Sequence, residues 1–185
     1  MKEAFLFVFG SIFSMFSFML IFRFFFQLTL SSHEHPILKF VYAMTNFVVF
    51  PARKVIPGIF GYEIASLVLA GIVEILLLLG TRLLLGYSVS WSLFLPLLAL
   101  VSIVKTIIYI ILFAVFIQAI LSWINPFNPM MSFLQSMTGP FLKNIRRKIP
   151  PVGGVDLSPL VLIFICQILL IWPIGSMEFY LISKI

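Results

Sequence analysis

Two polar side chains near the middle of long apolar segments are the residues best suited to ionic chemistry. Glu74 and Gln167 lie 93 positions apart, and each sits in an apolar run long enough to cross a bilayer. A carboxylate in hydrocarbon is costly and often marks a functional site, here an ion or proton contact at the interface between the two halves of the chain. Most polar side chains inside helix bundles instead form interhelical hydrogen bonds. We favour that structural role for this pair.

Two acidic residues stand just before apolar segments. Glu63 and Asp156 occupy matching positions, and Gly153 and Gly154 precede Asp156 in a glycine-rich turn. This pattern could bind a cation. A negative charge at a helix N-terminus is also favourable by itself, by about 0.3–1 kcal/mol. We favour this simpler role, with the acids paired to Arg23 or to nearby basic residues.

Basic residues cluster beside the apolar segments. Arg53 and Lys54 form one cluster, and Arg146, Arg147 and Lys148 form another. Basic residues at a membrane surface attract anionic lipid headgroups by about 1 kcal/mol each. They also set the orientation of the neighbouring spans. One cluster can do both, so the pattern predicts lipid or protein binding as well as sidedness.

The turn that follows the third apolar segment has its own recognition candidates. Trp123, Asn125 and Asn128 could form an edge on which a partner docks, or could be an interfacial anchor and ordinary turn residues. We favour the second reading. Gln118 is a further polar residue within the span. The run His33-Glu34-His35 has too few neighbouring ligands for a metal site and reads as a polar turn.

The composition predicts an all-α integral membrane protein. Hydrophobic residues make up 62% of the chain and charged residues 10%, against roughly 45–50% and 25% in soluble proteins. Mean hydropathy is +1.20. The net charge of +6 comes from residues beside apolar spans, which favours lipid headgroups over nucleic acid. The single cysteine, Cys166, lies in an apolar run and predicts no disulfide.

Four transmembrane helices are expected, at residues 4–26, 61–85, 101–123 and 160–182. Residues 93–101 are predicted as a short interfacial entry to the third span, with a fifth membrane segment at 93–104 as the alternative. An amphipathic helix should follow the first span and end at Pro51. Another should follow the third span and end at Gly139-Pro140. Both are expected to lie in the membrane interface.

An internal repeat relates the two halves, residues 1–88 and 89–185. Matches at the 93-residue offset include Thr45 with Thr138, and Arg53-Lys54 with Arg146-Arg147. Two spans per half give both halves the same orientation, a parallel repeat. The loops after spans one and three hold seven basic residues and the opposite side four, which predicts cytoplasmic loops and both termini outside. The seven are Lys39, Arg53, Lys54, Lys143, Arg146, Arg147 and Lys148.

The longest motif resembles the YggT family of small integral membrane proteins of bacteria, with relatives in chloroplasts. The matching residues are Ser122 to Pro129, Thr138-Gly139-Pro140, Ile145-Arg146-Arg147 and Val152 to Pro159. Gln118 departs from the family pattern, which often has arginine before the Ser-Trp pair. The resemblance implies a link to osmotic tolerance, cell division or, in plastids, nucleoid partitioning and cofactor assembly on cytochrome complexes. It implies no reaction.

These observations lead to a functional hypothesis. The chain is expected to be a non-enzymatic scaffold, assembly or stress-tolerance factor of the bacterial inner membrane, with no cofactor. Its basic loops would meet lipids or an unidentified protein partner, and a homo-oligomer through Ala70, Gly71 and Gly80 is one option. The alternative is an ion or solute pathway lined by Glu74 and Gln167. Two histidines and six scattered acids do not suggest a catalytic site.

Overall fold

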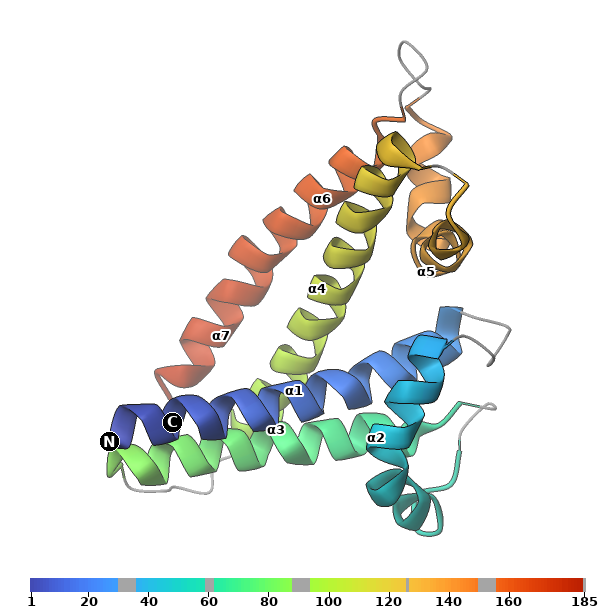
Figure 1. Cartoon of the computed structure of the whole chain (residues 1–185). Coiled ribbons are helices and arrows are strands. Elements are labelled where there is room, and N and C mark those ends of the chain that lie inside the picture. The colour runs from blue at the N-terminus through green and yellow to red at the C-terminus, as the bar shows by residue number, and fades with distance from the viewer. Residues whose placement is uncertain (30–35, 59–61, 88–93, 126, 150–155, 185) are drawn as a thin grey trace. The chain divides into compact units, whose positions relative to one another are not determined.

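All regular elements are helices in the computed structural model, which describes residues 1–29, 36–58, 62–87, 94–125, 127–149 and 156–184 (Figure 1). Four helical runs are long and apolar enough to cross a membrane. The all-α membrane fold and its four spans are therefore confirmed. In chain order the elements are α1 (Lys2–Thr29), α2 (Pro36–Arg53), α3 (Ile64–Leu85), α4 (Phe94–Ile124), α5 (Pro129–Arg146), α6 (Ser158–Leu169), the π-helical turn η1 (Leu170–Ile174) and α7 (Gly175–Ile182).

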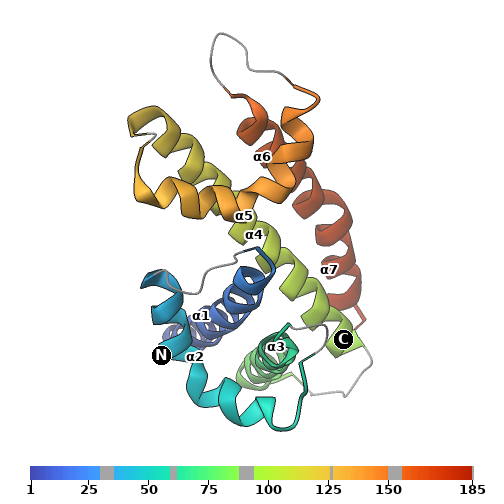
Figure 2. The same ribbon diagram turned by 90° about the vertical axis from the view of Figure 1, so that its right-hand side faces the viewer.

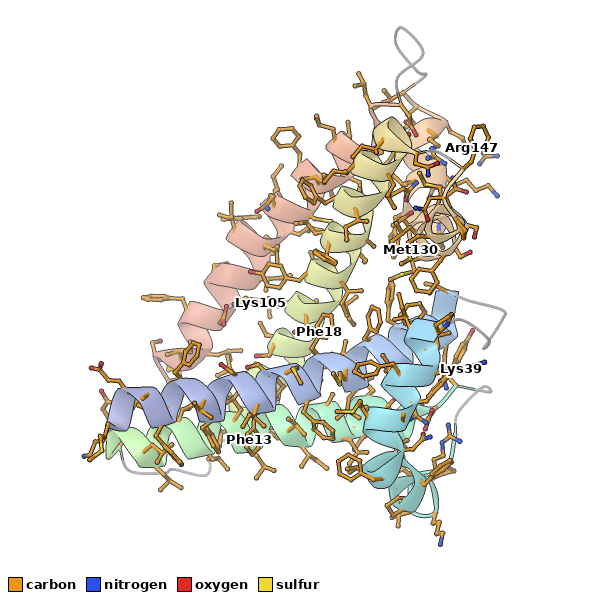
Figure 3. All side chains as sticks on the ribbon, in the orientation of Figure 1. Phe13, Phe18, Lys39, Lys105, Met130 and Arg147 are labelled. Atoms are coloured by element: carbon orange, nitrogen blue, oxygen red, sulfur yellow. The ribbon has the colours of Figure 1, made fainter. Side chains whose placement is uncertain are left out.

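The outer surface of the spans is apolar. Figure 3 shows side chains projecting outward along them, and Phe7, Phe113 and Phe179 expose more than half of their surface. Water would disfavour so much exposed apolar area, whereas acyl chains solvate it. The bilayer is the solvent that this exterior fits.

Helix α4 corrects the prediction for the third span. Phe94–Ile124 is one continuous helix of 31 residues, so neither an interfacial entry nor a fifth segment at 93–104 interrupts it. Pro96 lies in the first turn of the helix. The first four N–H groups of a helix have no intrahelical acceptor, so a proline there removes no hydrogen bond.

Prolines do not end the two shorter helices where the sequence predicted. Helix α2 continues past Pro51 to Arg53, and α5 continues past Pro140 to Arg146. An interior proline costs about 3 kcal/mol. In α5, Thr138 and Leu142 are buried on either side of Pro140, and their packing offsets that cost.

The last span contains a π-helical turn that the sequence analysis did not predict. Pro173 has no N–H to donate to Leu169, and its ring would clash with that carbonyl in a regular helix. In η1 the Gly175 N–H donates to Leu170 O, five residues back. A Cβ at Gly175 would lie 3.0 Å from the same oxygen. Glycine at this position thus allows the wider turn that accommodates the proline.

The chain forms two compact units, one of residues 1–106 with 177–185 and one of residues 107–176. In the first unit α1 and α3 lie side by side and antiparallel, and α2 crosses the end where α1 ends and α3 begins (Figures 1 and 2). In the second, α5 contacts α6 where that helix begins. The repeat boundary at 88/89 stays a prediction.

Small residues of α3 pack inside the first unit. Ala70 is fully buried, and a Cβ on Gly71 would contact Ile103 at 3.7 Å. A Cβ on Gly80 would come within 2.5 Å of the Phe9 ring. The residues considered for self-association are thus used for packing within one chain, and a homo-oligomer stays a prediction.

Candidate functional site

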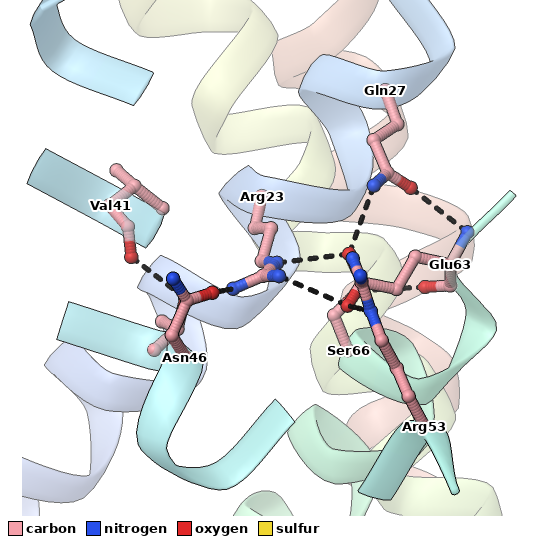
Figure 4. Close-up of polar contacts among 8 residues, drawn as sticks. Arg23, Gln27, Val41, Asn46, Arg53, Glu63 and Ser66 are labelled. Carbon is pink, nitrogen blue, oxygen red and sulfur yellow. Dashed lines mark hydrogen bonds and ion pairs between the residues drawn. The ribbon is translucent and has the colours of Figure 1, made fainter. Parts of the chain in front are cut away.

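Arg23 is the centre of a buried hydrogen-bond network in the first unit. Its guanidinium is 1% exposed and donates from Nη1 to Thr45 Oγ1 at 2.7 Å and to Asn46 Oδ1 at 2.8 Å (Figure 4). Nε and Nη2 donate to the two carboxylate oxygens of Glu63, each at 3.1 Å. The Tyr42 ring centroid lies 4.5 Å from the guanidinium carbon. This one side chain therefore joins α1 to α2 and to the residue before α3.

Glu63 is shared by several donors. Besides Arg23, Arg53 donates from Nε to the carboxylate, and Gln27 donates to it from Nε2 at 2.9 Å. The Glu63 N–H in turn donates to Gln27 Oε1 at 2.9 Å. Two guanidinium groups and an amide thus satisfy one buried carboxylate. We call Arg23, Gln27, Thr45, Asn46, Arg53 and Glu63 the first polar cluster.

The first polar cluster shifts the ionisation of its members. Burial raises the pKa of Glu63, but hydrogen bonds and charge from Arg53 and Arg23 outweigh it, so this pKa lies below its ordinary value. The hydrogen bond to Glu63 also raises the pKa of Arg53. Glu63 and Arg53 are therefore ionised at neutral pH.

The second unit holds a related but more open group of residues. The Thr138 hydroxyl donates to the Gln118 amide oxygen and lies 2.9 Å from Leu134 O. Arg146 donates from Nε to Asp156 Oδ2 at 2.8 Å, and Asp156 Oδ1 accepts from the Ser158 N–H at 2.9 Å. We call Gln118, Thr138, Arg146 and Asp156 the second polar cluster.

The two clusters repeat the same contacts. Arg53 and Glu63 are ten residues apart, as are Arg146 and Asp156. The Thr45 hydroxyl donates to Val41 O, and the Thr138 hydroxyl lies 2.9 Å from Leu134 O, in each case the carbonyl four residues back. The threonine partner on the preceding span is Arg23 in one unit and Gln118 in the other. Gln118 is therefore the structural counterpart of Arg23.

Asp156 differs from Glu63 in its surroundings. The Asp156 side chain is 36% exposed, against 5% for Glu63, whereas the matching arginines, Arg146 and Arg53, are 45% and 43% exposed. Burial raises the pKa of Asp156, but hydrogen bonds from Ser158 and Arg146 outweigh it and place it below its ordinary value. A cavity of about 410 Å³ adjoins Glu63, and one of about 390 Å³ adjoins Asp156.

The mid-span candidates lie in different compact units. Glu74 is buried in the first unit, where the Ser17 hydroxyl donates to its Oε1 at 2.6 Å. Gln167 is exposed on α6 of the second unit. The Ser17 contact fits the interhelical role that we favoured, and the pathway hypothesis stays a prediction.

The loop candidates fall into three groups. Lys54, Arg147 and Lys148 are exposed near the ends of α2 and α5, and Asn125 is exposed after α4. Asn128 caps α5, since its side chain accepts from the Met130 N–H at 2.9 Å. Three other candidates lie outside what the structure describes, namely the Trp123 side chain, Gly153 and Gly154.

Sequence reasoning missed several partners. Gln27 is one helical turn from Arg23, and that i, i+4 spacing could have suggested a shared target. Asn46 and Ser17 carried no comparable signal, because only tertiary packing brings them to Arg23 and Glu74. Glu178 was also missed. It pairs with Lys105 Nζ at 2.6 Å within the first unit.

Comparison with known proteins identifies the family. Residues 2–84 and 97–177 match the family model described as CCB3/YggT. The chain belongs to the CCB3/YggT family. This confirms the resemblance and its two tandem segments.

Relatives within the family come from several bacteria. A protein of Haemophilus influenzae is 32% identical over 84% of this chain and 83% of its own length. A Pseudomonas aeruginosa protein is 29% identical over 80% and 76%, and the YggT protein of Escherichia coli 26% over 88% and 85%. All three are described as uncharacterized proteins. No solved structure matches the chain.

Arg23 should be far more important for stability than Arg53, although both bind the same carboxylate. Arg23→Met removes the buried partner of Glu63 and should lower the free energy of unfolding by about 3–5 kcal/mol. Arg53→Met is the matched control. Because the Arg53 side chain is 43% exposed, its loss should cost at most about 1 kcal/mol. Thermal unfolding in detergent micelles, followed by circular dichroism, measures both, and equal losses would contradict the assignment.

The first polar cluster should make the fold acid-sensitive. Because the pKa of Glu63 is lower in the folded state than in the unfolded one, its contribution is complete above the unfolded pKa of about 4.3 and is lost as the pH falls through the folded value. Melting temperature should thus drop below about pH 4. Glu63→Gln should be less stable at pH 7 and show a shallower acid limb. An acid limb as steep as that of the wild type would refute this role.

Proposed function

We propose that this chain is a non-enzymatic membrane scaffold or assembly factor that presents two basic helix ends to lipids or protein partners. The observation that supports it is how the polar residues are used. The buried ones bind one another and hold α1, α2 and α3 together, whereas basic residues at the ends of α2 and α5 are exposed.

The exposed basic residues at the end of α5 are the proposed working surface. Lys143, Arg147 and Lys148 are exposed there, and Figure 3 shows Arg147 at this end of the helix. Anionic headgroups attract such residues by about 1 kcal/mol each. Arg146 also forms an ion pair with Asp156. It is therefore left unchanged in the variant below, so that only exposed charges are removed.

The outer face of α2 supports a position in the membrane interface. Phe40, Met44, Phe47 and Phe50 are exposed on it, while Leu38, Val41, Thr45 and Val49 are buried against the rest of the unit. An apolar face flanked by Lys39 and Arg53 is typical of interfacial helices. We infer that α2 rests on the hydrocarbon boundary and brings its basic end to the headgroups.

Removing the exposed charges of α5 should weaken anionic lipid binding without unfolding the protein. The triple variant Lys143→Ala, Arg147→Ala, Lys148→Ala should retain at least about tenfold less phosphatidylglycerol, because three attractions are lost. Native mass spectrometry of purified protein measures the retained lipid. The control is Lys2→Ala with Lys184→Ala, at the chain termini. Equal retention by the triple variant and wild type would count against the proposal.

The same triple variant tests the stress-tolerance aspect. In an Escherichia coli strain lacking its YggT relative, the wild-type chain should restore growth at high osmolarity and the triple variant should not. Membrane levels of both proteins must be equal by immunoblot. Full restoration by the triple variant would separate the basic surface from the cellular role.

The proposal requires both basic helix ends to face the cytoplasm of a bacterial inner membrane. Single cysteines at Val55 and Ser136, both exposed, in a Cys166→Ala background should be protected from an impermeant thiol reagent in intact cells. Both should react after permeabilisation. Labelling of both in intact cells would reverse the topology, and labelling of one alone would rule out the parallel repeat.

A further inference from the structure

The cavity beside Asp156 runs from a polar end into the span. Gln118, Ser122, Arg146 and Asp156 line its polar end. Phe116 on α4 and Ile163 on α6 line the part farther into the spans, and Ile120 and Leu160 lie beside the polar end. At about 1.5 Å per residue, the six helical rises from Ser122 back to Phe116 cover roughly 9 Å of α4, and the stretch from Leu157, just before α6, to Ile163 covers a similar length. The cavity is therefore a groove between α4 and α6 along the spans.

The first polar cluster indicates what the polar end of this groove can bind. There the Arg23 guanidinium bridges the repeat threonine and the repeat acid, Thr45 and Glu63. In the second unit Gln118 contacts the threonine, and the groove lies between Gln118 and the acid. The position that carries a cationic donor in one unit thus opens onto a groove in the other.

The walls of the groove select a lipid over a free solute. Phe116 and Leu160 are each 52% exposed, and they lie on helices that are long and apolar enough to cross the bilayer. A groove bounded by such residues opens toward acyl chains. Its polar end has an acid and a guanidinium side by side, which complements a headgroup carrying both a positive and a negative charge.

We propose that this groove binds a phospholipid with a primary-amine headgroup, phosphatidylethanolamine, which supplies in the second unit the cation that Arg23 supplies in the first. The ammonium donates to Asp156, to Ser122 Oγ and to the Gln118 amide oxygen. The phosphate, two carbons away, lies against the Arg146 guanidinium, and an acyl chain follows Phe116 and Ile163. This site is separate from the anionic-lipid surface at Lys143, Arg147 and Lys148.

Hydrogen-bond donors distinguish this headgroup from its relatives. An ethanolamine ammonium has three N–H groups, whereas a choline headgroup has none and is bulkier. Phosphatidylglycerol lacks the cation altogether. If the carboxylate and amide recognise N–H donors, affinity should fall stepwise as the amine is methylated.

The test is lipid titration of delipidated protein, read by native mass spectrometry. The wild type should bind phosphatidylethanolamine about tenfold more tightly than phosphatidylcholine, with mono- and dimethylated headgroups in between. Gln118→Arg introduces the guanidinium of the first unit and should abolish this preference. Gln135→Arg is the matched control, because Gln135 is exposed on α5 outside the groove. It should bind like the wild type.

A second variant tests the groove independently of the folding of Gln118→Arg. Ile163→Trp should fill the apolar part of the groove and weaken phosphatidylethanolamine binding while the Arg146–Asp156 pair stays intact. Equal wild-type binding of ethanolamine and choline lipids would overturn the proposal, as would a preference unchanged in both groove variants. Loss of the ethanolamine preference in the Lys143, Arg147, Lys148 triple variant would assign that preference to the basic surface and refute this site.

Discussion

A guanidinium with almost no solvent exposure must have its charge and its donors satisfied by the protein, and this requirement fixes the first half of the chain. Arg23 lies near the end of α1, and its acceptors come from α2 and from the residue before α3. Removing Glu63 would leave the buried Arg23 charge uncompensated, at a cost of several kcal/mol. The placement of α2 across the end of α1 and α3 therefore depends on this one side chain, and a span with one arginine is used to position three helices.

The second half has corresponding polar contacts, but its acidic residue is more exposed to solvent. An arginine at the end of the short helix still bonds an acid ten residues later, and a threonine still contacts the preceding span. Because Gln118 has no charge, Asp156 has no buried cationic partner, and its side chain is 36% exposed against 5% for Glu63. Exposed pairs contribute about 0–1 kcal/mol. The first unit is therefore held by its polar contacts, whereas the second must rely on apolar packing.

Much of this arrangement follows from the sequence, because hydrophobic runs and a repeat offset are properties of the chain itself. The four spans, the two short helices and the matching of Thr45 with Thr138 could all be predicted. The helix ends could not be. Pro51, Pro96 and Pro140 were interpreted from local rules, and tertiary packing or position in the first turn overrode these. Partners such as Asn46 and Ser17 depend on how helices rotate against one another, which a hydrophobic pattern does not specify.

The number of donors that already contact each acidic residue also determines which half can bind an external ligand. A carboxylate that already accepts from two guanidinium groups and an amide, as Glu63 does, has little capacity left for another donor. Asp156 accepts from one guanidinium and one backbone N–H, so it retains lone pairs for a further donor. Replacing an arginine by Gln118 weakens the internal support of the second unit and leaves its acid able to accept from outside. The same carboxylate position can therefore either stabilise the fold or bind an external donor. Glu63 stabilises the first unit, and Asp156 is available for binding in the second.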